Sequence, residues 1–106
     1  MPCSGNSQRL NAASIDSLLA DVENWELVYN GARIRRSWRV KDFPTALDFF
    51  CRIGTIAESE DHHPDIHLTN YRDVVIELWT HAADGLTEND FIMAAKINEI
   101  PIELKP

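Results

Sequence analysis

The sequence has little of what would place it in a specialised structural class. Its 106 residues include only two cysteines, four glycines and five prolines. Cys3 lies in a polar N-terminal segment and Cys51 in an apolar run, so we interpret them as a tail thiol and a buried packing thiol of an ordinary cytosolic protein. Acidic residues outnumber basic residues. The resulting net charge of −7 excludes nucleic acid as the main partner, because phosphate binding needs a basic surface.

Long hydrophobic runs are missing too. No apolar stretch has the length of a membrane-spanning helix, and the first residues lack the apolar core of a secretory signal. We therefore expect no membrane partner and a cytoplasmic location. An organelle is the alternative if a transit peptide has been removed.

What remains is the composition of one small globular domain, 44% apolar and 25% charged. We expect residues 1–11 to be a flexible N-terminal tail and residues 12–106 to form a single domain. A domain of this size leaves much of its surface exposed, so oligomerisation is a plausible way to bury more of it.

The hydrophobic periodicity predicts a short helix followed by a hairpin. Apolar residues from Ile15 to Val22 recur at helical spacing, with Ser14 as the expected N-cap. From Trp25 the period changes to two, and Asn30-Gly31 is the strongest short hairpin signal. Pairing across this turn places Leu27 opposite Ile34, and Glu26 opposite Arg35.

The next helix, expected to begin near Asp42, has more apolar surface than one sheet can cover. Its two stripes are Phe43, Leu47, Phe50, Gly54 and Ala57, and Ala46, Phe49, Ile53 and Ile56. One stripe can pack on the sheet, and the second indicates a partner subunit.

The remaining chain predicts two strands and a last helix. The strands are expected at 66–70 and 74–81, and Thr87 with Asp90 forms a capping-box-like start for a helix that Pro101 ends. The order α-β-β-α-β-β-α predicts an α+β fold, a four-stranded antiparallel sheet with three helices packed on one face.

The histidines are the candidate reactive groups. His62 and His63 lie between a helix and a strand, and His81 ends a strand where a loop begins. Imidazole exchanges protons near neutral pH, and reactive side chains commonly lie at the ends of elements. Taken alone, the adjacent pair is equally well explained as a loop feature or as a charge partner of a helix C-terminus.

A longer pattern surrounds these histidines. It runs Glu58-Ser59-Glu60-Asp61-His62-His63-Pro64, then Tyr71, Val74, Thr80-His81 and Gly85-Leu86-Thr87-Glu88-Asn89-Asp90, with Trp25 and Asp42-Phe43 upstream. This pattern resembles the pterin-4a-carbinolamine dehydratase family from about Leu18 to Ile100. The sequence departs from the commonest family pattern by one extra residue between His63 and Tyr71. It also has Asn89 where other members often carry Arg or Lys, which puts a substrate contact from that position in doubt.

The resemblance implies an activity and an assembly. The family dehydrates 4a-hydroxytetrahydropterin, the 4a-carbinolamine, to quinonoid dihydropterin, and so recycles the pterin cofactor of aromatic amino acid hydroxylases. It works without a metal or cofactor. Its subunits form homo-oligomers, usually a dimer of dimers.

The resemblance also implies the site residues. His62 and His81 would be the acid–base pair and His63 would hold and polarise the pterin, because histidine meets the required pKa with little tuning. Asp61 and Glu58 would orient or charge-stabilise the imidazoles. Other expected substrate-binding residues are Trp79, Thr80, Ala82 and, as an apolar wall, Trp25.

Several of these residues have plainer explanations that the sequence leaves open. Glu58 can be a solvated helix residue, Trp25 a core residue and Asp90 only a helix cap. His67 is interpreted as a surface or interface histidine. Arg33, Arg35 and Arg39 share one strand face, and we interpret them as a solvated row that pairs with Glu26.

Three alternative functions are weaker. A non-catalytic dimerisation or coactivator module of the same fold is the main alternative, because family members in animals also act as dimerisation partners of a homeodomain transcription factor. A catalytically dead assembly chaperone would lack the histidine set. A metal-dependent hydrolase using His62, His63, His67 and His81 lacks the usual ligand spacing, so no metal is expected.

Overall fold

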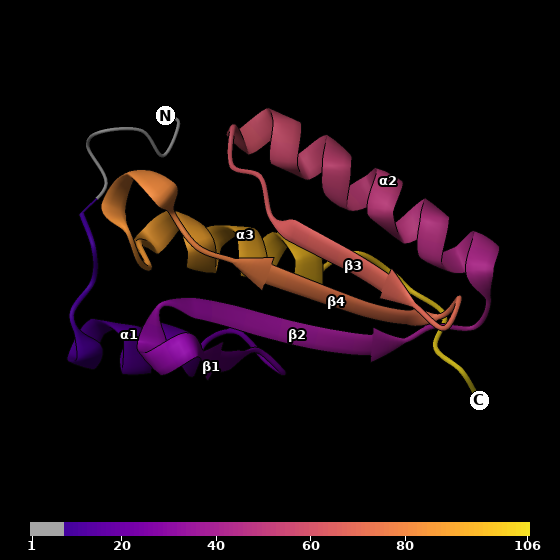
Figure 1. Ribbon diagram of the computed structural model, residues 1–106, viewed down its shortest axis with the longest axis horizontal. Helices are drawn as coiled ribbons and strands as arrows, with labels where there is room; N and C mark the ends of the chain where they lie inside the picture. The colour runs from indigo at the N-terminus through magenta and orange to yellow at the C-terminus, as the bar shows by residue number, and fades with distance from the viewer. Residues whose placement is uncertain (1–7) are drawn as a thin grey trace.

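The predicted order of elements is confirmed. The computed structural model describes residues 8–106, which form a four-stranded antiparallel sheet with strand order β1-β2-β4-β3 (Figure 1). The elements are α1 (Ala12–Leu19), β1 (Glu26–Val28), β2 (Arg33–Arg39), α2 (Phe43–Glu60), β3 (Asp65–Thr69), β4 (Asp73–Leu78) and α3 (Glu88–Asn98), with the short 3₁₀ helices η1 (Tyr29–Gly31) and η2 (His81–Ala83).

The first hairpin has the predicted register. Leu27 pairs with Ile34, and Glu26 with Arg35. Asn30 and Gly31 adopt φ values of 55° and 87°, the left-handed conformation that favours these residue types. The turn chemistry therefore fixes which face of β2 is buried.

Helix caps explain where the helices begin, with one difference from expectation. Asn11, not Ser14, caps α1, since its side chain accepts a hydrogen bond from the Ser14 backbone N–H at 2.8 Å. Asp42 caps α2 in the same manner through Thr45. At α3 the side chain of Thr87 and that of its N3 residue form the predicted capping box.

One face of the sheet and the helices enclose the core. Phe49 and Ile53 of α2 are 1% exposed, whereas Phe43 and Leu47 of the same helix are 47% and 45% exposed. The second apolar stripe thus begins on the outer surface of α2. Cys51 is also exposed, contrary to the expected packing thiol, because it lies on this outer side of the helix. Cys3 is outside the described residues.

The other face of the sheet carries a charged network. Glu77 of β4 is 4% exposed and accepts hydrogen bonds from Arg33 and Arg35 of β2. Burial would raise the pKa of Glu77, but the hydrogen bonds from Arg35 and Arg33 outweigh it and hold the pKa below its usual value. Arg33 and Arg35 therefore pair with a buried carboxylate on β4 and Arg39 pairs with Asp73, in place of the expected pairing with Glu26.

Both ends of the described chain are tied to the domain. Residues 8–11, expected in a flexible tail, contact the loop after η2: Leu10 N–H donates to Leu86 O at 2.8 Å, and Arg9 donates to Asp84 O. The rest of the expected tail is outside the described residues. Leu104 bridges Val40 beyond the end of β2. Within residues 8–106, no helix has the length and hydrophobicity that a membrane crossing needs.

Candidate active site

The end of α2, the start of β3 and the end of β4 meet at one end of the molecule, opposite the C-terminus (Figure 1). Asp61 terminates α2 in the left-handed conformation with φ 51°, and the His62 backbone N–H donates to Ala57 O. The chain then turns, so His62 and His63 precede β3. His81 opens η2, directly after Thr80, which bridges to Gly85. Antiparallel pairing of β3 and β4 brings the two histidine-bearing segments together.

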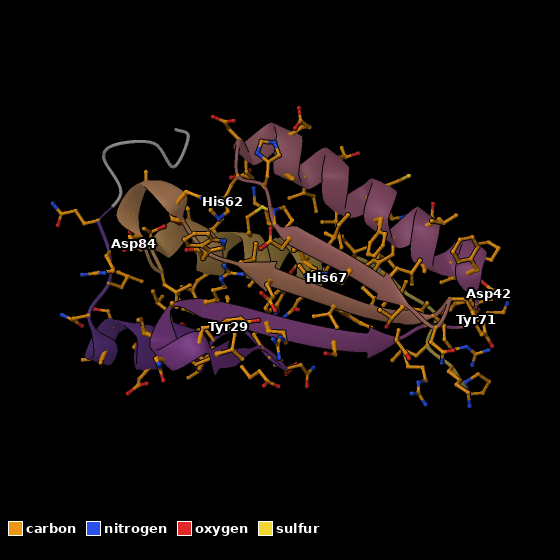
Figure 2. The ribbon with its side chains drawn as sticks, in the orientation of Figure 1. Tyr29, Asp42, His62, His67, Tyr71 and Asp84 are labelled. Carbon is orange, nitrogen blue, oxygen red and sulfur yellow. The ribbon has the colours of Figure 1, made fainter. Side chains whose placement is uncertain are left out.

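A cavity of about 320 Å³ lies between these segments. The residues that line it are Asp61, His62, His63, Trp79, Thr80, His81 and Ala82. The structure thus brings together the three histidines and most of the substrate-binding residues that the sequence suggested. Figure 2 shows His62 at this end of the molecule and His67 farther along β3.

His62 is held by a buried carboxylate. Its Nε2 lies 2.6 Å from Oδ1 of Asp90, and the two side chains are 5% and 0% exposed. A carboxylate only accepts hydrogen bonds, so Nε2–H is the donor and Nδ1 is the unprotonated nitrogen of the neutral ring. Asp90 therefore selects the tautomer of His62.

The carboxylate of Asp90 is itself fixed from the other side. Its Oδ2 accepts hydrogen bonds from the Thr80 hydroxyl at 2.8 Å and from the Thr87 backbone N–H at 2.9 Å. The Thr80 and Thr87 hydroxyls are 2.9 Å apart. These three buried residues connect the end of β4 to the first turn of α3. Asp90 is therefore both a helix cap, the role that the sequence favoured, and the residue that orients His62.

The other two histidines are in more open surroundings. Nε2 of His63 lies 2.6 Å from Oε2 of Glu58, and both side chains are largely exposed. The contact supports an orienting role for Glu58. His81 is exposed, and its ring centroid lies 3.9 Å from that of Trp79 with the planes tilted by 41°. One histidine is thus buried and rigidly held, and two are open to water.

Comparison with known proteins identifies the family. The sequence profile described as "Pterin 4 alpha carbinolamine dehydratase" matches residues 8–100. The chain belongs to this family. The mitochondrial pterin-4-alpha-carbinolamine dehydratase 2 of Arabidopsis thaliana is 51% identical over an alignment of 106 residues that covers 97% of this chain and 57% of the relative. The chain thus spans little more than half the length of that relative.

Other members of the dehydratase family match over most of their length. A putative pterin-4-alpha-carbinolamine dehydratase of Methylococcus capsulatus is 41% identical over 96% of this chain and 89% of its own. The crystal structure described as a transcriptional coactivator/pterin dehydratase from Brucella melitensis has a TM-score of 0.81 and 36% identity. That match covers 86% of this chain and 96% of that chain.

Two residues lie away from the cavity of this dehydratase-family member. Trp25, expected as a wall of the site, is a core residue that is 6% exposed. Its Nε1–H donates to Oδ1 of Asn98 at 2.8 Å, and its ring packs edge-on against Trp38. The physical reason is that a buried indole needs an acceptor for its N–H, which α3 supplies in the core. His67 lies on β3 with its side chain exposed, as expected for a surface histidine.

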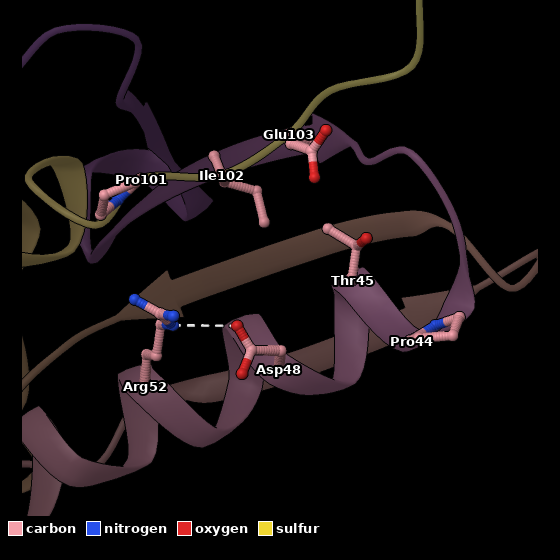
Figure 3. Close-up of a pocket in the computed structure, with 7 residues that line it drawn as sticks. All are labelled: Pro44, Thr45, Asp48, Arg52, Pro101, Ile102 and Glu103. Atoms are coloured by element: carbon pink, nitrogen blue, oxygen red, sulfur yellow. Dashed lines mark hydrogen bonds and ion pairs between the residues drawn. The ribbon is translucent and has the colours of Figure 1, made fainter.

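A larger cavity, of about 510 Å³, lies between the first half of α2 and the C-terminal segment (Figure 3). Asp48 and Arg52 line it and form an ion pair of 2.9 Å along the helix. Its lining has no histidine, so acid–base chemistry near neutral pH points to the smaller cavity. Among residues 8–106, no cluster of three or more His, Cys, Asp and Glu is arranged to hold a metal ion.

Proposed function

We propose that this protein dehydrates 4a-hydroxytetrahydropterin to quinonoid dihydropterin by histidine acid–base catalysis. The observation that carries the proposal is the convergence of His62, His63 and His81 on one cavity, with His62 fixed by a buried aspartate. Membership of the dehydratase family supports the substrate class.

The reaction requires two proton transfers. The C4a–O bond breaks and the departing hydroxyl gains a proton to become water, while N5 loses its proton and a C4a–N5 double bond forms. Groups with pKa values near ambient pH perform both transfers best, and the unperturbed pKa of histidine is about 6.5. His62 and His81 form the acid–base pair in this proposal, because each of the two segments that line the cavity contributes one of them.

His63 holds and polarises the pterin. Its ring nitrogen Nε2 lies 2.6 Å from Oε2 of Glu58, so the carboxylate orients the ring. Asp61, Trp79, Thr80 and Ala82 complete the substrate-binding surface. The indole of Trp79 offers an apolar face to the flat pterin ring.

The biological setting follows from this chemistry. The substrate already carries a hydroxyl at C4a, so a pterin-dependent aromatic amino acid hydroxylase, which oxygenates its pterin cofactor, is the expected source. The exposed apolar residues of α2 support a homo-oligomer, expected as a dimer of dimers. We favour the cytoplasm, and the mitochondrial name of the Arabidopsis relative supports an organelle as the alternative.

The deciding experiment supplies freshly generated 4a-hydroxytetrahydropterin and follows formation of quinonoid dihydropterin, with the spontaneous reaction subtracted. His62→Ala and His81→Ala should each lower kcat by about 10²–10⁴-fold, the range of a positioned acid or base. His63→Ala should also raise KM, because this residue holds the ground state. His67→Ala is the matched control and should retain wild-type kinetics. Near-normal turnover in both His62→Ala and His81→Ala would contradict the mechanism.

A coactivator or dimerisation module remains the second candidate. It is favoured by the outer surface of α2, where Phe43 and Leu47 are nearly half exposed, and the Brucella relative is described as a transcriptional coactivator as well as a dehydratase. Wild-type protein that does not accelerate dehydration above the spontaneous rate would favour this module over the enzyme.

A further inference from the structure

The charged face of the sheet reaches the cavity through a stack of side chains. Trp79 lines the cavity, and its ring lies 3.9 Å from the ring of His81 between centroids. The guanidinium carbon of Arg33 lies 4.6 Å from the centroid of the same indole. A guanidinium at this distance is attracted to the indole face. Arg33 is therefore linked to a proposed catalytic histidine through one aromatic ring.

Arg33 is itself held in place. Its Nη1 donates to Oε1 of Glu77 at 3.0 Å and to Oδ2 of Asp65 at 3.3 Å, so carboxylates from β4 and β3 both fix the guanidinium. The Glu77 side chain is 6% exposed and the Arg33 side chain 28% exposed. The pair is therefore largely shielded from water, unlike the exposed Arg39–Asp73 pair at the other end of β2.

His81 needs a neighbouring side chain to fix its orientation more than His62 does. Its side chain is exposed and belongs to a helix of three residues, whereas His62 is buried against Asp90. An exposed imidazole samples several rotamers unless a neighbour restricts it, and proton transfer requires a defined geometry. The indole of Trp79 is the neighbour that lies against the ring of His81.

We propose that Arg33 is a positioning residue for the dehydration: it holds the indole of Trp79 in place, and the indole in turn orients His81 toward the cavity. This inference rests on the proposed function. Arg33 touches neither the reacting atoms nor His81 in this scheme, and acts through Trp79.

The kinetic test compares three arginine variants. Arg33→Ala should lower kcat by about three- to tenfold, the size of one cation–π contact, with a smaller rise in KM. Arg33→Lys should lower kcat less than Arg33→Ala does, since lysine keeps the positive charge but lacks the planar group that stacks on the indole. Arg35→Ala is the matched control, because Arg35 also binds Glu77 but its guanidinium lies over the ring of Tyr29. An equal loss in Arg35→Ala would overturn the proposal, since the effect would then come from Glu77.

A double-mutant cycle tests the route through the indole. In a Trp79→Ala background, Arg33→Ala should cause no further loss of kcat, because the residue through which it acts is missing. Independent, additive losses would overturn the proposal. Circular dichroism should show all variants folded, since Glu77 retains Arg35 when Arg33 is removed.

A spectroscopic readout separates this inference from the proposed function. In NMR spectra the imidazole protons of His81 should carry a ring-current shift from Trp79, which Arg33→Ala reduces and Arg35→Ala leaves intact. His67 serves as the internal control. If the wild type is active and the His81 signals of Arg33→Ala are the same as those of the wild type, the positioning role alone is overturned. An inactive wild type with the expected shifts would overturn the dehydratase function and leave the positioning of His81 supported.

Discussion

Replacing Asp90 by Asn tests whether the tautomer of His62 matters for catalysis. The Thr87 backbone N–H can only donate, so it requires an acceptor where Oδ2 of Asp90 now lies. The amide oxygen of Asn will occupy that position and its NH₂ group will face His62. Nε2 of His62 must then accept a hydrogen bond, and the ring proton moves to Nδ1. Nδ1 of His62, which is unprotonated in the neutral wild-type ring, then carries the ring proton and can no longer accept one.

The structure sets the expected size of the effect. Loss of a correctly protonated acid or base corresponds to about 10²–10⁴-fold in kcat, or about 2.7–5.4 kcal/mol in the activation free energy. The fold should survive, because Asn keeps an acceptor for Thr87 and for Thr80. Weaker hydrogen bonds and the loss of a negative charge at the start of α3 should lower the free energy of unfolding by about 1–3 kcal/mol.

Glu88→Gln provides the matched control. Glu88 is an exposed carboxylate in the same first turn of α3, so the substitution removes the same charge from the same helix end. Its kcat should stay at the wild-type value. Steady-state kinetics measures kcat, urea unfolding measures the free energy of unfolding, and ¹⁵N NMR of the His62 ring reports its tautomer. A folded Asp90→Asn protein with kcat within about threefold of wild type would refute the reasoning.

Three further predictions concern stability, the core and assembly. Hydrogen bonds to Glu77 hold its pKa low, so the unfolded state binds the proton more readily. This contribution to stability is present above the unfolded pKa of about 4.3 and is lost as pH falls through the folded value. Urea midpoints should therefore fall with acid less steeply in Glu77→Gln than in wild type, and equal slopes would contradict this. Trp25→Phe should lower the free energy of unfolding by about 1–2 kcal/mol through its lost hydrogen bond and leave KM unchanged, whereas a raised KM would place Trp25 at the site. Light scattering of the wild type should show assembly above the 12.1 kDa monomer, with Leu47→Lys shifted toward monomer, and a strictly monomeric wild type would refute this.

Local signals in the sequence predicted most of the fold. The register of the first hairpin follows from Asn30-Gly31 and from matching apolar and charged pairs across the turn. The capping box at Thr87 likewise depends on residues close in sequence. The candidate site was found because its histidines lie at the ends of elements and within a recognisable pattern.

Contacts between elements far apart in sequence were the ones that could not be predicted. Arg35 lies opposite Glu26 on β1 and also opposite Glu77 on β4, because β2 is a central strand. The hairpin reveals only the first neighbour, and the hydrogen bonds form with the second, more buried carboxylate. Asp90 was explained by its capping role, and only the packing of α3 beneath the end of β4 reveals its contact with His62.

The different surroundings of the two proposed acid–base histidines suit the reaction. The proton that N5 loses balances the proton that the departing hydroxyl gains, so the enzyme must only return each histidine to its starting state. In the proposed mechanism His62 keeps its Nε2–H on the buried Asp90, and its proton exchange takes place at Nδ1. His81 is exposed and can exchange its proton directly with water between turnovers. In the proposed mechanism a fixed histidine therefore sets the geometry and an open one resets the proton balance, and this division requires that His81 be held by a ring contact rather than by burial.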